Sequence, residues 1–183
     1  MTRALLVIDV QMEYFSGALP VSYPAGSLEL ILAAMDAAME HLVPVAVIQH
    51  AGASPQAPLF APGGPGWPLH PEVAQRPRDI LIPKQLPGSF TGTELGPWLA
   101  ELGADTVAIC GYMTQMCCDT TSRQAFHQGL NVEFLSDATG TLDMANSVGQ
   151  VSAEQLHQAI LVTQAARFAT VLTTQEWINS LAA

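Results

Sequence analysis

Asp9, Lys84 and Cys117 each follow a short apolar run of the sequence, and their side chains could act together in catalysis. The cysteine is the most informative, because the residues after Gly111 lead into a helix-compatible segment whose first turn would carry it. Backbone N–H groups and the dipole at a helix start favour a thiolate, and the same N–H groups could bind the oxyanion of a carbonyl under attack. The pattern therefore predicts a nucleophilic cysteine.

Each of these residues also has a purely structural explanation when taken alone. Cys110, Cys117 and Cys118 could be small apolar core residues, because free cysteine is among the most buried residue types. Asp9 could cap the turn that follows it, and an isolated lysine such as Lys84 is usually a solvated surface charge. The catalytic interpretation therefore depends on the fold bringing the three residues together.

Strand and helix patterns alternate along the whole chain. The apolar runs predict strands at 3–10, 43–50, 79–82, 106–110, 131–135 and 168–172. Amphipathic spacing and capping residues predict helices at 27–41, 93–102, 115–127, 153–166 and 174–181. This order favours a single α/β domain over residues 1–183, with a mostly parallel sheet covered on both faces. The carboxyl ends of parallel strands share one edge, where Asp9, Lys84 and Cys117 would converge.

Two segments lack a regular apolar pattern and are predicted to be loops. Residues 11–26 are rich in aromatic and turn-forming residues and could shape a pocket wall. Residues 51–77 are dense in Pro and Gly; we expect an ordered lid or subunit contact, with a disordered linker as the alternative. The candidate pocket residues, any of which could instead belong to the core, are Gln11, Phe15, His50, Trp67, Phe90 and Tyr112.

Composition limits the partners of the protein. Six basic and sixteen acidic residues give a formal charge of −10, which would repel nucleic acid. No apolar run approaches the roughly 20 residues that span a bilayer, and the start lacks the pattern of a secretory signal. With three cysteines and no zinc-type spacing, we expect a cytoplasmic protein without membrane contact. A content of 49% hydrophobic and only 12% charged residues favours a homo-oligomer, a dimer or larger.

Several motifs, in this order and spacing, resemble the isochorismatase-like cysteine hydrolases, the family related to nicotinamidase and N-carbamoylsarcosine amidohydrolase. They are the run 6–11 (Leu-Val-Ile-Asp-Val-Gln), Pro83-Lys84 followed by Ser89-Phe90 and 93–95, Gly111-x-x-Thr114-x-x-Cys117 followed by Thr121 and Arg123, and the run 136–139 (Ser-Asp-Ala-Thr). The match extends along nearly the whole chain. It implies a three-layer α/β/α fold with an Asp-Lys-Cys triad that, in several members, hydrolyses amides and related C–N bonds.

The resemblance also implies a role for each matched residue. Cys117 would be the nucleophile, Asp9 the base and proton carrier, and Lys84 the cation that stabilises the thiolate. The peptide before Met113 would be cis, and the N–H groups of Met113 and Cys117 would form the oxyanion hole. The expected reaction is hydrolysis of a small amide-like substrate through a thioester.

The sequence departs from parts of the family pattern. Nicotinamidases carry a metal site that begins Asp-x-His after the second strand, whereas this chain has Gln49-His50-Ala51. We therefore expect no catalytic metal and no cofactor, with His50 and His70 as pocket or structural residues. Two alternatives remain open: an isochorismatase-type vinyl-ether hydrolase with Asp9 as its acid, and a non-catalytic oligomeric or ligand-binding protein.

Overall fold

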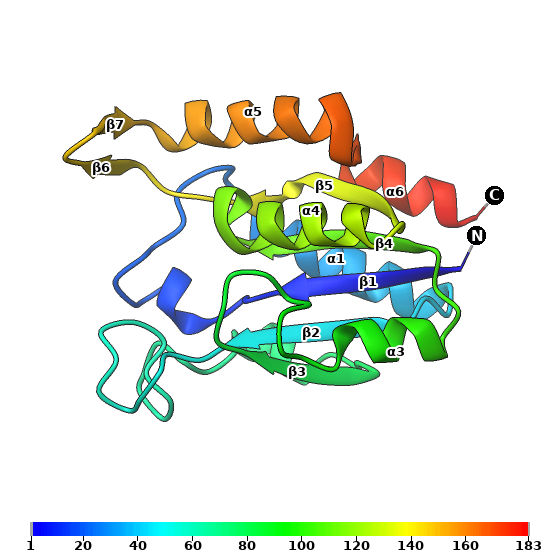
Figure 1. Cartoon of the computed structure of the whole chain (residues 1–183), viewed down its shortest axis with the longest axis horizontal. Helices are drawn as coiled ribbons and strands as arrows, with labels where there is room; N and C mark the ends of the chain where they lie inside the picture. Colours follow the sequence, from blue (N-terminus) through cyan, green and yellow to red (C-terminus); the bar gives the residue numbers. More distant parts are fainter. Residues whose placement is uncertain (1, 183) are drawn as a thin grey trace.

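The computed structural model describes residues 2–182 and contains a central sheet of six strands in the order β3-β2-β1-β4-β5-β8 (Figure 1). All five strand pairings in this sheet are parallel. The strands are β1 (Arg3–Ile8), β2 (Val45–His50), β3 (Ile80–Lys84), β4 (Thr106–Tyr112), β5 (Asn131–Gly140) and β8 (Thr170–Leu172). The sheet confirms the predicted α/β class.

Helices cover both faces of the sheet and complete the three layers. The α-helices are α1 (Ser27–Glu40), α2 (Pro71–Gln75), α3 (Leu95–Glu101), α4 (Asp119–His127), α5 (Ala153–Thr163) and α6 (Thr174–Leu181). Residues of α1, α2 and α6 pack into one apolar cluster, and residues of α3, α4 and α5 pack into the other. In Figure 1, α3 and α4 lie in front of the sheet and α1 lies behind it.

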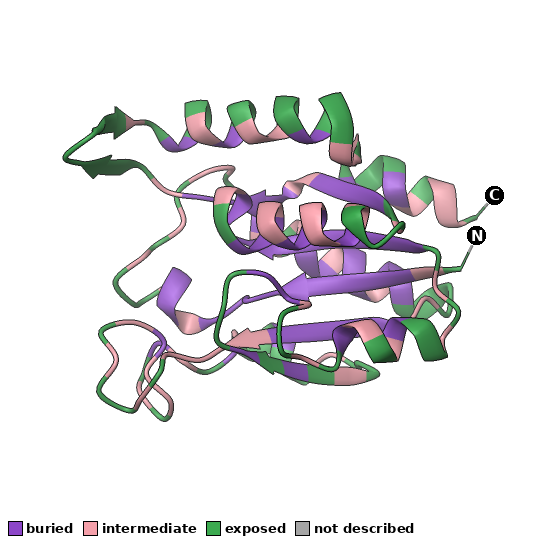
Figure 2. Ribbon diagram, in the orientation of Figure 1, coloured by how far each residue is buried: buried purple, intermediate pink, exposed green. Residues whose placement is uncertain are grey.

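The central strands are buried because both of their faces are covered. In β1, Leu5 and Val7 belong to the α1 side of the core, and Leu6 and Ile8 belong to the α3–α4 side. All four side chains are fully buried, as the purple strands of Figure 2 illustrate. Such burial explains why this strand reads as a continuous apolar run rather than an alternating one.

The structure corrects several predicted boundaries. Strand β5 continues to Gly140 instead of ending at Leu135, through a shift of its register with β4. The helix expected at 115–127 begins as a π-helical turn, Thr114–Cys118, before α4. A second π-helical turn, Gln164–Phe168, ends the helix that starts with α5.

Other elements were not predicted. A 3-10 turn, Met12–Tyr14, lies in the first predicted loop, and helix α2 lies within the second. Residues 51–70 contain no helix or strand, yet they are placed as an ordered loop held by bonds such as Gly52 N to Phe60 O. The hairpin of β6 (Met144–Asn146) and β7 (Gly149–Val151) projects from the body of the molecule and is almost wholly exposed (Figure 2).

Both edges of the sheet are short strands. The edge strand β3 contains Pro83, which pairs in register with Gln49 of β2. Strand β8, at the opposite edge, has only three residues.

Among residues 2–182, no helix is both long enough and apolar enough to cross a membrane.

The order in which the chain adds strands to the sheet reverses at β1, which makes this strand the topological switch point. From β1 the chain moves outward to β2 and β3, and it then returns to β4 on the other side of β1. Ligands of open parallel sheets bind beyond the carboxyl ends of the strands at such a point. The loops 11–26 and 51–70 lie at this end of the sheet in Figure 1.

Candidate active site

Asp9 lies directly beyond β1, at the switch point, and its side chain is fully buried. Its φ angle is +51°, in the left-handed region that few residues other than glycine adopt. The turn is held by bonds from Asp9 N to Ile48 O at 3.0 Å and from Gln11 N to Asp9 O at 2.8 Å. This conformation ends β1 and directs the chain into the loop beside the site.

Lys84 is the last residue of β3, and its side chain is also fully buried. Its Nζ lies 2.7 Å from Asp9 Oδ2 and 3.2 Å from Cys117 Sγ. The same ammonium lies 3.2 Å from Leu86 O and 3.4 Å from His50 Nδ1. The structure therefore brings the three predicted residues together around one cation.

Cys117 lies in the π-helical turn between β4 and α4 and is 7% exposed. The Tyr112–Met113 peptide before this turn is cis, as the family resemblance implies. The N–H of the next residue, Cys118, closes the turn by donating to Met113 O at 3.3 Å. The nucleophile candidate thus sits in the first turn of a helix, where the sequence placed it.

Gly111 allows β4 to lie close against β1 just before this turn. Its φ angle is +115°, and an added Cβ would overlap the carbonyl oxygen of Ile8. Only a residue without a side chain fits this contact, which brings the end of β4 beside Asp9.

Burial controls the ionisation of the cysteine. It raises the pKa of the Cys117 thiol; the Asp9 carboxylate raises that pKa further, and Lys84 lowers it. Burial lowers the pKa of Lys84, but the charges of Asp9 and Cys117 outweigh this and leave the lysine pKa raised. Burial therefore disfavours the thiolate in the resting site, and the Lys84 ammonium favours it. Lys84 thus lowers the thiol pKa, the direction that the sequence predicts, while removal from water opposes it.

Of the predicted pocket residues, Gln11 and His50 lie beside the trio, and Trp67 joins them through its backbone. Gln11 Nε2 donates to His50 O at 2.9 Å and to Trp67 O at 2.6 Å, and its Oε1 accepts from His50 N at 2.8 Å. The Gln11 amide, which is fully buried, therefore ties the loops together. Burial and Lys84 lower the pKa of His50, which keeps the imidazole neutral.

The aromatic candidates lie on different sides of the sheet. The Phe15 ring packs 4.5 Å from the His70 ring and 5.9 Å from the Tyr112 ring, on the α1 side. Tyr112 is buried and bonds to Ser27 Oγ at 3.0 Å. Phe90 packs with the α3–α4 cluster instead. His70 caps α2 through Nδ1, at 3.4 Å from Glu72 N.

Two supporting contacts were not assigned from the sequence. His157 of α5 bonds to Thr114 at the start of the cysteine turn, and Ser89 bonds to Thr121 of α4 at 2.8 Å. A buried position for His157 could have been suspected from the helical spacing of α5, but its partner is 43 residues away in sequence. Among residues 2–182, no group of three or more His, Cys, Asp or Glu side chains is arranged to hold a metal ion.

Comparisons with known proteins agree with this fold. The family model for the Isochorismatase domain matches residues 3–176. A crystal structure of an isochorismatase-type protein from Burkholderia xenovorans LB400 has a TM-score of 0.96 and 48% identity, covering 99% of this chain and 88% of that one. YddQ, an isochorismatase family protein of Bacillus subtilis, is 31% identical over 98% of this chain and 100% of its own length. Nicotinamidase 3 of Arabidopsis thaliana is 30% identical over 97% of this chain and 88% of its own length.

The parallel sheet covered on both faces, together with these matches, defines a hydrolase of the α/β/α type. The chain belongs to the isochorismatase family.

Proposed function

We propose that this protein is a metal-independent cysteine hydrolase that cleaves the C–N bond of a small amide-like substrate through a thioester. The observation that carries the proposal is the position of Lys84 Nζ, 2.7 Å from Asp9 Oδ2 and 3.2 Å from Cys117 Sγ. A thiol that lies beside a carboxylate and a fixed cation has the groups that can activate a cysteine nucleophile.

In the proposed reaction, the Asp9 carboxylate takes the proton of Cys117 as the sulfur attacks the substrate carbonyl. Lys84 stabilises the thiolate that forms. The N–H groups of Met113 and Cys117 bind the oxyanion of the tetrahedral intermediate. Asp9 then gives its proton to the nitrogen of the leaving amine as the C–N bond breaks, which leaves an acyl group on the sulfur.

Asp9 also acts in the second half of the reaction, in which water hydrolyses the thioester. The Asp9 carboxylate takes a proton from water, and the hydroxide equivalent attacks the thioester carbonyl. Collapse of this intermediate breaks the C–S bond, releases the carboxylic acid and returns the proton to sulfur. The relative named nicotinamidase supports an amide as the substrate class.

The test is a screen of small primary amides followed by mass spectrometry of the quenched enzyme. We expect an acyl adduct on the peptide that contains Cys117, and loss of turnover by at least about 1,000-fold in Cys117→Ala. Cys118→Ala is the matched control, because Cys118 is fully buried and should retain turnover. Full turnover in Cys117→Ala would contradict the thioester mechanism and favour an ether hydrolase with Asp9 as its acid.

A further inference from the structure

The segments that leave the carboxyl ends of the strands carry very few basic residues. These segments are 9–26, 51–70, 84–94, 113–118 and 141–152. Their only lysine or arginine is Lys84, whereas their acidic residues are Asp9, Glu13, Glu94 and Asp143. The loops that surround the site therefore have an excess of negative charge.

Lys84 has no donor left for an anionic substrate. A lysine ammonium has three N–H donors, and four acceptors surround this one at 2.7 to 3.4 Å: Asp9, Cys117, Leu86 O and His50. A substrate carboxylate would have to displace one of these contacts. Displacing Asp9 or Cys117 would dismantle the group that the reaction needs.

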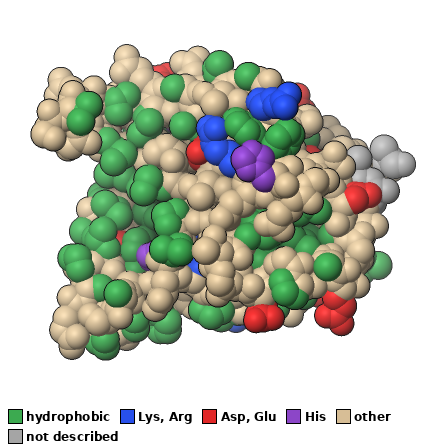
Figure 3. All heavy atoms as spheres, viewed as in Figure 1, with side chains coloured by type: hydrophobic (Ala, Val, Ile, Leu, Met, Phe, Trp, Pro, Cys, Tyr) green, Lys and Arg blue, Asp and Glu red, His purple; other side chains and the backbone are tan. Residues whose placement is uncertain are grey.

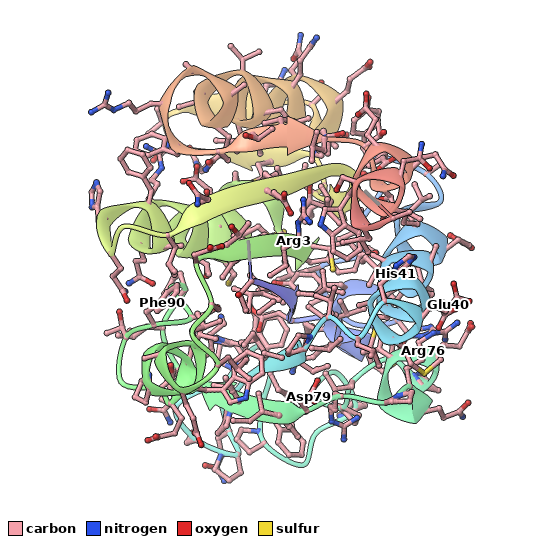
Figure 4. The ribbon with its side chains drawn as sticks, turned by 90° about the vertical axis from the view of Figure 1, so that its right-hand side faces the viewer. Arg3, Glu40, His41, Arg76, Asp79 and Phe90 are labelled. Carbon is pink, nitrogen blue, oxygen red and sulfur yellow. The ribbon has the colours of Figure 1, made fainter. Side chains whose placement is uncertain are left out.

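The arginines are engaged elsewhere. Their partners are Glu133 for Arg3, Asp36 for Arg76, Ala74 O for Arg78, Asp119 for Arg123 and the Phe126 ring for Arg167. Figure 4 is viewed from the end where the strands begin, and it shows Arg3 and Arg76 on that side. On the face shown in Figure 3, Lys and Arg groups are few, and hydrophobic side chains gather toward the left, where the strands end.

Glu13 adds a carboxylate near the site that no cation in residues 2–182 neutralises. Its oxygens accept from Ala18 N at 2.7 Å and from Phe60 N at 3.2 Å. The Phe60 ring packs 5.1 Å from the ring of His50, which borders Lys84. With Asp9 and Lys84 compensating one another, the Glu13 charge makes this end of the molecule negative.

We infer that the site accepts uncharged or cationic substrates and rejects those that carry a carboxylate or phosphate close to the scissile bond. The inference names the substrate class of the proposed hydrolase and rests on that proposal. An anion here would lose its hydration without gaining a free cation, and the acidic surface would slow its approach.

The experiment compares the alkylation of Cys117 by iodoacetamide and by iodoacetate, two reagents of similar size that differ in charge. Rates are measured by mass spectrometry at pH 8 and divided by those of 2-mercaptoethanol under the same conditions. We expect the normalised rate with iodoacetate to be at least about tenfold below that with iodoacetamide, and the difference to shrink in about 1 M NaCl. Equal normalised rates, or faster reaction with iodoacetate, would overturn the inference.

A charge introduced beside the nucleophile provides the matched control. Met116 precedes Cys117 in the π-helical turn and is exposed, and Met116→Lys should raise the iodoacetate rate at least about threefold, while Met116→Gln should not. Equal effects of the two variants would assign the selectivity to shape rather than to charge and would contradict the inference.

Measuring the hydrolysis of amides that differ in charge distinguishes a failure of this inference from a failure of the proposed function. Benzamide, its 4-aminomethyl derivative and its 4-carboxy derivative form a series of neutral, cationic and anionic amides. Hydrolysis of the first two and not of the third supports both proposals, and equal hydrolysis of the third overturns the charge selection. If none is hydrolysed but the alkylation preference holds, the amidase proposal loses support and the charge selection stands.

Discussion

His157 Nδ1 lies 2.8 Å from Thr114 Oγ1, so helix α5 holds the first residue of the turn that carries Cys117. The other ring nitrogen, Nε2, lies 2.9 Å from the carbonyl oxygen of Ser136 in β5. Because a carbonyl only accepts, Nε2 carries the proton and Nδ1 accepts from the threonine hydroxyl. A neutral imidazole thus joins β5, α5 and the cysteine turn.

This contact predicts a dependence of stability on pH. Burial lowers the pKa of His157 below its ordinary value of 6.5, against a smaller opposing effect of the Ser136 bond. As the pH falls below about 6.5, the unfolded chain binds a proton here that the folded protein does not, so stability is lost. Between pH 7 and pH 5, urea midpoints should fall more steeply for the native protein than for His157→Gln. Parallel curves would contradict a neutral, buried His157.

Replacing the same histidine should also affect catalysis. His157→Leu leaves Thr114 and the Ser136 carbonyl without a partner, which costs about 1–3 kcal/mol of stability. We expect kcat to fall about tenfold with little change in KM, because the turn that positions the nucleophile loosens. His157→Gln, which can make both bonds, should recover most of kcat. A change confined to KM would argue against this positioning role.

Substitutions of the two charged partners should change the reactivity of Cys117 in opposite directions. The Asp9 carboxylate raises the thiol pKa and Lys84 lowers it. Asp9→Asn should therefore speed alkylation by iodoacetamide at pH 7, and Lys84→Gln should slow it, each by at least about threefold, since one pKa unit changes the thiolate fraction about tenfold. Both variants should lose turnover. Faster labelling of an inactive Asp9→Asn enzyme would separate thiolate formation from proton transfer.

Gly111 should tolerate no side chain. Gly111→Ala combines a positive φ with overlap of Ile8 O, and we expect a loss of more than about 3 kcal/mol in the free energy of unfolding. Gly103→Ala is the matched control, since Gly103 has a φ of +62° but no atom within 4 Å of the added Cβ. It should cost only about 1 kcal/mol. Urea denaturation measures both, and similar losses would contradict the close approach of β4 to β1.

Thr121 should matter to the loop that follows Lys84. Its hydroxyl accepts from Ser89 N at 3.1 Å and lies 2.8 Å from Ser89 Oγ, and both residues are fully buried. Thr121→Val keeps the shape but leaves the serine unpaired, which should cost about 1–3 kcal/mol and lower kcat. Thr121→Ser should restore both values. Failure of that rescue would point to a packing role for the methyl group instead.

The trio could be predicted from the sequence because each member follows an apolar run that forms a parallel strand. Lys84 lies 75 residues after Asp9, and Cys117 lies 33 residues after Lys84. The strand ends at one edge of the sheet nevertheless bring Asp9 and Cys117 within bonding distance of Lys84. The direction of the thiol pKa could not be obtained this way, since it depends on how completely the loops exclude water.

The errors in the fold have similar causes. Strand β5 is longer than predicted because its polar residues find distant partners: Asp137 accepts from Thr174 N and Oγ1 at 2.7 Å, and Ser136 O accepts from His157. The hairpin of β6 and β7 has short, exposed strands and gives no apolar alternation to detect. The length of β5 thus depends on tertiary contacts, and the hairpin lies outside the core, so neither leaves a local apolar pattern in the sequence.

Pro83 limits the ability of the edge strand β3 to pair with a strand of another chain. A sheet edge presents unpaired N–H and C=O groups on which another chain can add a strand and begin an aggregate. Proline has no N–H to offer, and the three residues of β8 leave little length for pairing at the opposite edge. A chain with 49% hydrophobic residues can therefore carry a six-stranded sheet with little template for fibril growth at either side.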